Sequence, residues 1–426
     1  MTMSTEYPGP RLKESFERWY RPRRDAVARR LMEYIEIPTV TPDEHAASEF
    51  LTDYLSTVGA DLEPVACAPA LNQHPAWSPH GQSSTGPDRG SWRSTLGEGT
   101  SGTRTLFNAH VDVVPPSPDF PDAFRPRRVD DMVIGRGACD TKNNLIMLVE
   151  AVRFLRDEGI PLSRTAVLDL PIEEEIGGNG TLSLALQAPD VDEAVCLEPT
   201  SLQVLRGHRG CLSFRVDVHG RSVHMGSTHS GLDAIAGALE VIDRLRDLER
   251  HLLQQARTEP GFEDVPFPLQ LNVGMISGGE WSGSVAERCS IWADVGFMPT
   301  TSLLELERQV EQACRSIPTR EMAETLTIRT DVGLRNDAYL TDATEPVVTD
   351  LVSAISRHSL RPEPPRGWHV SCDARIYQKV AGLPTAIFGS GTLADAHSPH
   401  EQVSLTELGN GIAILAGFLS SPPGLA

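Results

Sequence analysis

Three adjacent acids, Glu173, Glu174 and Glu175, directly follow an apolar run that ends at Ile172. Acids side by side at the end of a buried strand repel one another and lose solvation, so a positive group is expected to offset them. A solvated acidic run is more typical of a helix surface or a tail. The offsetting group is either a metal ion or a cluster of arginines, and we favour the metal.

A histidine and two further acids stand near the ends of other predicted elements. His110 and Asp112 are two residues apart, and on a strand they face the same way, so the acid can orient the histidine. A metal-bound histidine usually donates its other N–H to such a group. A His–Asp hydrogen bond in a packed loop is the alternative. Asp140 precedes a predicted helix and is either a metal ligand or the N-cap of that helix.

Two more candidate ligands come later in the chain. Glu198 ends another strand-like run, and His397 lies in a loop near the C-terminus. In open α/β sheets, ligands bind at the carboxyl ends of the strands. The acids and the histidine expected at those ends, joined by His397, are enough for two metal ions that share a bridging carboxylate.

The elements that must position these residues alternate between strand and helix. Apolar runs rich in β-branched residues predict buried strands at 105–114, 165–172 and 194–197. Between the first two, apolar residues recur at helical spacing over 143–158. This order predicts an α/β catalytic domain, with a mainly parallel sheet and helices on both faces.

From residue 208 onward the pattern changes. Apolar and polar residues alternate over 212–218, which indicates a sheet with one solvated face. Ser302 and Glu305 form a capping box at the start of a helix. Further strand-like runs lie at 269–276, 289–295 and 326–330. We therefore predict a smaller α+β domain, residues 208–332, inserted into a catalytic domain made of residues 1–207 and 333–426.

Residues 69–104 read as a polar loop, because Leu71 and Leu96 are the only branched aliphatic residues in this stretch. Its glycines at 97, 99 and 102 match the G-x-G-x-x-G pattern of dinucleotide sites. That pattern must follow a strand and open a helix, whereas here it precedes a predicted strand. The sequence therefore does not support a nicotinamide cofactor.

Composition excludes several classes of partner. The 426 residues include 38 Lys and Arg against 58 Asp and Glu, a formal charge of −20, which argues against binding to nucleic acid or to an anionic membrane surface. The seven cysteines are scattered and form no C-x-x-C pair, which indicates reduced thiols. The N-terminus lacks the apolar segment of a signal peptide, so we expect a cytoplasmic protein.

Taken together, these stretches and their order resemble the M20 metallopeptidase and deacylase family, most of all its acetylornithine deacetylase and succinyl-diaminopimelate desuccinylase-like members. The resemblance runs from about residue 24 to 420. It implies that His110 and Glu198 hold one metal ion and that Glu175 and His397 hold the other. Asp140 would bridge the two ions.

The resemblance also assigns the residues around the metal ions. It implies that Glu174 is the general base, that Asp112 supports His110, and that a non-proline cis peptide follows Asp140. His400 is a rival to His397 as ligand, but His397 keeps the spacing of the family.

Substrate contacts are implied less directly. The runs 220–224 (GRSVH) and 231–235 (GLDAI) resemble the signature of the M20 lid domain, which mediates dimerisation. This resemblance implies that His224 stabilises the oxyanion of the substrate across a homodimer. A surface histidine in a turn is the alternative. Arg375 matches an arginine that receives a substrate carboxylate, with a salt bridge as the alternative. Gly389 and Gly391 resemble a substrate-binding loop.

Two positions of the lid depart from the family pattern, in addition to His400. Many relatives have an asparagine where this chain has Gly283, and an arginine where it has Gly296. The carboxylate contacts of the lid are therefore missing or rebuilt, and the substrate of acetylornithine deacetylase should not be copied to this protein.

These observations predict a metal-dependent hydrolase of non-peptide C–N bonds. We expect it to use two divalent ions, most simply zinc with manganese or cobalt possible, on the amide of an N-acyl amino acid or related small N-acyl amine. A dipeptidase or carboxypeptidase with the same machinery is the near alternative. A non-catalytic small-molecule binding protein with this fold is the alternative from another class.

Overall fold

A computed structural model describes residues 9–79, 90–187, 189–358 and 360–424, and side chains from residue 12 onward. A nine-stranded sheet forms its larger part, in the order β1-β2-β6-β3-β7-β16-β8-β14, with β15 beside β8. Its strands are β1 (Glu63–Val65), β2 (Ser91–Gly97), β3 (Arg104–Asn108), β6 (Thr165–Leu170), β7 (Glu193–Cys196), β8 (Leu205–His208), β14 (Tyr339–Leu340), β15 (Arg366–Trp368) and β16 (Thr385–Ile387). The central run β6-β3-β7-β16 is parallel, as predicted.

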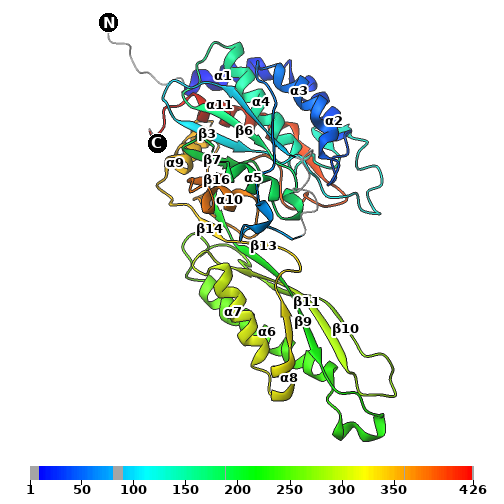
Figure 1. Cartoon of the computed structure of the whole chain (residues 1–426). Helices are drawn as coiled ribbons and strands as arrows, with labels where there is room; N and C mark the ends of the chain where they lie inside the picture. The colour runs from blue at the N-terminus through cyan, green and yellow to red at the C-terminus, as the bar shows by residue number, and fades with distance from the viewer. Residues whose placement is uncertain (1–8, 80–89, 188, 359, 425–426) are drawn as a thin grey trace.

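Helices cover both faces of this sheet, because neighbouring residues on its buried strands point to opposite sides. Phe107 and Val195 pack into a core with α4 (Lys142–Asp157), α9 (Pro346–Arg357) and α11 (Leu405–Ser420). Leu106 and Ala194 pack instead with α5 (Asn179–Leu186) and α10 (Ala374–Lys379). The N-terminal helices α1 (Gly9–Tyr20), α2 (Arg24–Ile35) and α3 (Ser48–Ser56) lie on the outside of the α4–α11 layer (Figure 1). The predicted α/β architecture is confirmed.

A second, antiparallel sheet extends away from the first (Figure 1). Its strands are β9 (Gly210–His219), β10 (Leu271–Gly278), β11 (Arg288–Phe297), β12 (Thr327–Arg329) and β13 (Arg335–Asn336), and its helices are α6 (Ala234–Ala256), α7 (Leu303–Arg315) and α8 (Arg320–Thr325). These elements enclose a hydrophobic cluster of their own. Burial alternates along β9, and the Ser302 hydroxyl accepts the N–H of Glu305 at the start of α7. The domain boundaries at 208 and 332 stay a prediction; β13 pairs with β9 just beyond the second of them.

The prediction of a polar loop over 69–104 is wrong for residues 91–97, which form β2 and pair with both β1 and β6, while residues 80–89 lie outside the described part of the chain. Trp92 and Leu96 are buried there. The charge of Arg93 is neutralised by the buried Asp169, which accepts hydrogen bonds of 2.6 and 2.9 Å from its guanidinium. A central ion pair thus makes a polar segment suitable for a sheet. Gly97 ends β2, and the chain continues into β3 rather than a helix, so a dinucleotide fold is still not formed.

Strand β3 is shorter than predicted. It ends at Asn108, so His110 and Asp112 lie in an irregular segment after it and not on the strand itself. A small third sheet of β4 (Arg127–Val129), β5 (Met132–Ile134) and β17 (Gln402–Ser404) joins the loops on this side of the molecule. Within the part of the chain that the structure describes, no helix has the length and apolar character needed to cross a membrane.

A buried arginine ties the large sheet to its helix layer and generates a stability prediction. Arg164 is fully buried, forms ion pairs with Glu193 (3.0 Å) and Asp350, and donates to the carbonyls of Phe418 (2.9 Å) and Ser421 (2.7 Å). Arg164→Met leaves two buried acids without their cation. We expect it to lower the free energy of unfolding by roughly 3–5 kcal/mol, measured by urea denaturation.

The matched control is Arg320→Met, whose pair with Glu324 joins side chains that are 91% and 66% exposed. An exposed pair of this kind contributes about 0.5 kcal/mol or less. Equal effects of the two substitutions would contradict the assignment of Arg164 as a core tie.

Candidate metal centre

The parallel strands β6, β3 and β7 bring their carboxyl ends to one edge of the large sheet. Asn108 at the end of β3 pairs with Asp169 of β6 and with Cys196 of β7. The segments that follow these strands carry His110, the three glutamates and Glu198. Sequence positions that lie about 90 residues apart therefore converge because the sheet is parallel and its central strands end together.

Asp140 lies between two histidines. Its Oδ1 is 3.0 Å from His110 Nε2, and its Oδ2 is 3.2 Å from His397 Nε2. His397 Nε2 is also 2.9 Å from Oε2 of Glu175. His110, Asp140 and Glu175 form a group whose ligand atoms lie within 4.8 Å of one another. One carboxylate with a histidine at each oxygen has the arrangement needed to bridge two metal ions.

Two buried carboxylate oxygens in this region accept no hydrogen bond from the residues that the structure describes. They are Oε1 of Glu175 and Oε1 of Glu198. Glu198 itself groups with the thiols of Cys196 and Cys372, again within 4.8 Å. A buried acceptor without a partner is costly, and a cation coordinated by these oxygens would remove that cost. The donor set therefore fits divalent metal ions.

The titration of these groups is strongly displaced. Burial raises the pKa of Glu175 and raises the pKa of Glu198 well above the ordinary value of a glutamate. Burial would also raise the pKa of Asp140, but its hydrogen bonds with His110 and His397 outweigh burial and lower it. Hydrogen bonds with Asp140 and Glu175 raise the pKa of His397 to about 11. The centre thus holds excess negative charge, which protons on the histidines balance where metal ions do not.

Asp112 holds the glutamate turn more directly than it holds His110. Its two carboxylate oxygens accept the backbone N–H groups of Glu174 (3.1 Å) and Glu175 (3.0 Å). His110 Nδ1 instead lies 2.9 Å from the backbone carbonyl of Asp112 and 3.6 Å from its carboxylate. Because a carbonyl only accepts, Nδ1 carries the hydrogen, and in the neutral ring Nε2 is left as a ligand atom facing Asp140.

Glu174 is enclosed next to this centre. Burial, followed by the negative charge of Asp373, raises the pKa of Glu174 well above its usual range. Asp373 is fully buried, and one of its oxygens has no hydrogen-bond partner among the described residues. A glutamate with a raised pKa is suited to hold and release a proton near neutral pH.

The alternative reading of Asp140 as a helix cap is wrong. Thr141 is the N-cap residue of α4, and it makes no side-chain capping bond. The predicted cis peptide between Asp140 and Thr141 is confirmed. Asp140 therefore stands outside the helix, on the turn that points it toward the two histidines.

Residues that the sequence did not single out hold this turn. Glu401 accepts the backbone N–H groups of Gly137 (2.9 Å), Cys139 (3.2 Å) and Asp140 (3.2 Å) and pairs with the buried Arg136 at 2.5 Å. The next residue after the cis peptide, Lys142, is also buried and donates to the carbonyls of Tyr34 (3.0 Å) and Ile37 (2.7 Å). The signal available in the sequence was the polar run 140–144 (DTKNN) at the start of an apolar helix.

The glycine loop packs against the ligand-bearing segments. A Cβ at Gly389 would lie 2.4 Å from the Glu198 carbonyl, and one at Gly391 would lie 2.6 Å from Cys139 Cβ. Gly391 also has a positive φ of 97°. Both glycines are thus required for close packing of the centre, and their contact with substrate stays a prediction.

Arg375 is buried and its terminal nitrogens are engaged. Nη1 donates to the Cys372 carbonyl (2.7 Å) and Nη2 donates to the Gly177 carbonyl (2.9 Å), while the nearest carboxylate, on Asp373, is 3.6 Å away. This arrangement fixes the segment that follows the three glutamates. The predicted role of Arg375 as the receptor of a substrate carboxylate stays a prediction.

His224 is not brought to the centre within one chain. It is exposed, follows β9, and caps the short helix η4 (Met225–Ser230) at the far end of the smaller sheet (Figure 1). Its Nδ1 accepts the N–H of Gly226 at 3.1 Å. His400 and His397 are both exposed. Among the described residues, an acid of the centre contacts His397 but none contacts His400.

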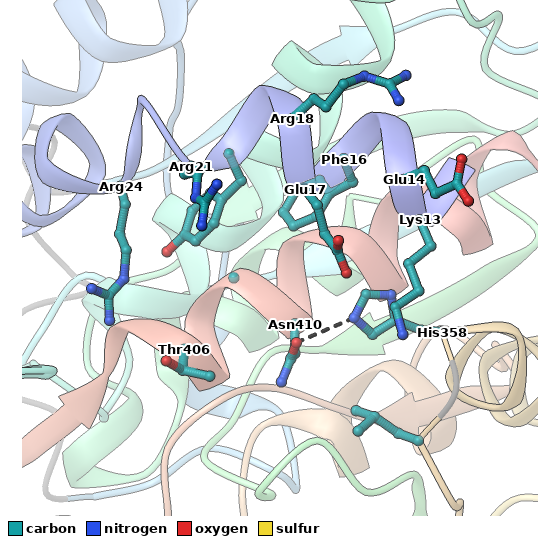
Figure 2. Close-up of a pocket in the computed structure, with 13 residues that line it drawn as sticks. Lys13, Glu14, Phe16, Glu17, Arg18, Arg21, Arg24, His358, Thr406 and Asn410 are labelled. Atoms are coloured by element: carbon teal, nitrogen blue, oxygen red, sulfur yellow. Dashed lines mark hydrogen bonds between the residues drawn. The ribbon is translucent and has the colours of Figure 1, made fainter. Parts of the chain in front are cut away.

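A hollow of about 930 Å³ lies elsewhere, between α1, α11 and His358 (Figure 2). None of the predicted site residues lines it. Its walls mix lysine and arginine with Glu14 and Glu17, and His358 is hydrogen-bonded to Asn410 at 3.2 Å. The charges are therefore mixed, and this hollow has no donor set comparable to that of the centre.

Comparison with known proteins shows the family to which this chain is similar. The profile of Peptidase family M20/M25/M40 matches residues 106–421. The chain is 26% identical over 343 residues to the N-formyl-4-amino-5-aminomethyl-2-methylpyrimidine deformylase of Bacillus subtilis. The aligned part is 74% of this chain and 78% of the deformylase. It is also 26% identical over 334 residues to the acetylornithine deacetylase of Aliivibrio fischeri, which covers 76% of this chain and 82% of that protein.

Solved structures share the fold. The aminopeptidase PepT of Bacillus cereus superposes with a TM-score of 0.71 at 18% identity and covers 93% of this chain and 98% of its own. Human carnosine dipeptidase 1 superposes with a TM-score of 0.68 at 17% identity and covers 96% of this chain and 98% of its own. Since the family profile spans well over half of the sequence, the chain belongs to Peptidase family M20/M25/M40 of metal-dependent hydrolases.

Proposed function

We propose that this protein is a dinuclear metal-dependent amidohydrolase that cleaves the amide of an N-acyl amino acid or related small N-acyl amine. The observation that carries the proposal is Asp140, whose two oxygens each face a histidine beside the half-buried Glu174 and Glu175. In this proposal His110 and Glu198 hold one ion, Glu175 and His397 hold the other, and Asp140 bridges them. Relatives named for removal of formyl and acetyl groups support a deacylase.

Two divalent cations would supply polarisation of the scissile carbonyl and a lower pKa for the attacking water. Glu174 takes the proton from that water and delivers it to the leaving amine. Asp112 keeps Glu174 in place through the backbone of the turn. The hydrogen bond from His110 Nδ1 to the Asp112 carbonyl leaves Nε2 of the neutral ring without a hydrogen, as a ligand atom. Zinc is the metal we expect; histidine and carboxylate ligands also accept manganese or cobalt.

A peptidase is the second candidate. It is favoured by the fold shared with an aminopeptidase and a dipeptidase, but at 18% and 17% identity that likeness concerns the fold alone. The deacylases match at 26% identity over about three quarters of the chain, which favours the first candidate. A non-catalytic binding protein is disfavoured because all five proposed ligands and the base are present.

We further propose that residues 208–332 form a lid through which the protein dimerises. Strand β10 is an edge of the small sheet, and its Met275 and Ile276 are 58% and 48% exposed. On the neighbouring helix α6, Ile235 and Leu239 are 40% and 56% exposed. An uncovered edge strand with an apolar helix beside it suits a two-fold contact with a second copy. His224 would then act in the partner's site.

The domain outside the lid, residues 1–207 and 333–426, carries the metal centre in this proposal. Among the described residues none of the seven cysteines forms a disulfide, which suits the reducing environment of the cytoplasm.

Metal removal tests the proposed function. We expect chelated protein to be inactive and to regain activity when zinc or manganese is restored, because the buried acids need cations to assemble the site. N-acetyl, N-formyl and N-succinyl amino acids should be assayed beside dipeptides. Turnover of dipeptides alone would replace the deacylase by the peptidase, and ligand binding without turnover of any substrate would support the binding protein.

Glu174→Gln tests the general base. The amide has nearly the same shape but cannot take a proton, so we expect kcat to fall by about 10²–10⁴ with metal content unchanged by elemental analysis. Glu324→Gln, an exposed acid of the lid, is the control and should retain wild-type turnover. Wild-type kcat in Glu174→Gln would show that the base is another residue.

A hybrid dimer tests whether His224 acts across subunits. His224→Ala and Glu174→Gln chains are each expected to be nearly inactive as homodimers. Co-expression under two affinity tags gives hybrids in which one of the two sites has both an intact Glu174 and an intact partner histidine. Purified hybrids should therefore recover about half of the wild-type activity per dimer. Hybrids as inactive as their parents would contradict a role for His224 in the partner's site.

A further inference from the structure

An arginine at the junction of the two sheets has donors that no protein group uses. Arg209 follows β8 and precedes β9, and it is half-buried. Its backbone N–H donates to Trp368 O at 3.0 Å, and its side-chain Nε donates to the His369 carbonyl. Within the described residues, Nη1 and Nη2 have no hydrogen-bond partner, and no carboxylate forms an ion pair with this guanidinium. Half-buried cations normally find a partner, so an external one is expected.

Gly296 provides the space that this guanidinium occupies. Gly296 pairs with Cys211 across β11 and β9, and a Cβ at position 296 would lie 2.2 Å from Arg209 Nη1. Any side chain there would displace the guanidinium. Gly296 is one of the lid positions at which the sequence departs from the family pattern. The guanidinium of Arg209 occupies the space that a side chain at position 296 would fill.

The surroundings of Arg209 are poor in negative charge. Burial lowers the pKa of Arg209, and only Cys211 and Asp294 oppose this effect. The Asp294 carboxylate already accepts a hydrogen bond from Ser213. Burial and the cations Arg209 and Arg366 lower the pKa of His369. An anion placed at the Nη atoms would therefore meet the Arg209 guanidinium, which forms no ion pair with a carboxylate of the described residues.

This position is connected to the metal centre by a short segment. Residues 368–373 run from the partners of Arg209 to Asp373, the acid whose charge raises the pKa of Glu174. Asp373 is four positions after His369, so their Cα atoms are at most about 14 Å apart when the segment is extended. Burial raises the pKa of Cys211 to about 11, and the charges of Arg209 and Arg375 both lower it, so the two guanidiniums lie near the same side chain. Both terminal nitrogens of Arg375 are already engaged by carbonyls.

We propose that Arg209, seated over Gly296, receives a carboxylate of the substrate and makes the enzyme selective for anionic N-acyl compounds. This inference rests on the proposed function. The role that the sequence assigned to Arg375 thereby passes to Arg209, and Arg375 becomes a positioning residue for the turn of the glutamates.

The test compares one substrate with its neutral form: the best N-acyl amino acid of the panel and the corresponding carboxamide. Arg209→Gln is expected to raise KM for the carboxylate about tenfold to a hundredfold while kcat stays within about twofold, because a charge-assisted contact is lost. KM for the carboxamide should change by less than about twofold. Arg209→Lys should recover part of the loss, since it keeps the charge but not the fork.

Two further variants separate the position of the guanidinium from general charge. Gly296→Ala leaves Arg209 in the chain but displaces it, and should raise KM for the carboxylate in the same direction. Arg366→Gln removes the neighbouring cation, which is paired with Glu363 at 3.4 Å, and should leave KM within about twofold.

The possible results divide clearly. An equal rise of KM for the carboxylate and the carboxamide in Arg209→Gln, or no rise for either, would overturn the inference while leaving the amidohydrolase intact. If wild-type protein hydrolyses neither form after metal is restored, the proposed function itself has failed. Far-UV circular dichroism and carboxamide turnover show that each variant is folded.

Discussion

The candidate metal centre depends on one constraint: several carboxylates lie close together, and among the described residues histidines are the side chains that face them. Asp140 is held between His110 and His397, and buried oxygens of Glu175 and Glu198 are left without hydrogen-bond partners among the described residues. A fold gains nothing in stability from such an arrangement, because desolvated like charges repel. Divalent cations bound to these oxygens would make it favourable. The rest of the large sheet and its loops can be understood as the scaffold that holds these acids in place.

That scaffold is built from buried polar contacts rather than from packing alone. Asp112 holds the turn of the glutamates by two backbone N–H groups, and Glu401 holds the turn of Asp140 by three. Lys142 fixes the start of α4 to the C-terminal end of α2 and the segment that follows it. Each contact joins a charged side chain to backbone groups, which fixes the segments that carry the proposed ligands. Ligand positions are thereby set by residues that are not ligands themselves.

The two sheets divide the work between them. The large parallel sheet gathers the ligands at one edge, while the smaller sheet exposes an apolar edge strand and carries His224 at a distance from the centre. Arg209 stands where the chain passes from one sheet to the other, so a substrate group bound there would touch both parts. Substrate selection is therefore expected at the junction, and the chemistry in the large sheet.

The sequence alone determined the α/β class, the smaller α+β region and the residues that converge on the centre, because strand periodicity and acids placed after apolar runs are local features. Only the tertiary structure decided which polar residues were structural. Strand β2 was missed because Arg93 is neutralised by Asp169, 76 residues away, and Glu401 was missed because it holds a turn 261 residues away. The tertiary structure also decided which guanidinium is available. Both Nη atoms of Arg375 donate to carbonyls, whereas among the described residues Arg209 has a side-chain hydrogen bond only through Nε. Such pairings depend on which segments the fold brings together, and a periodic pattern carries no information about partners that are distant in the chain.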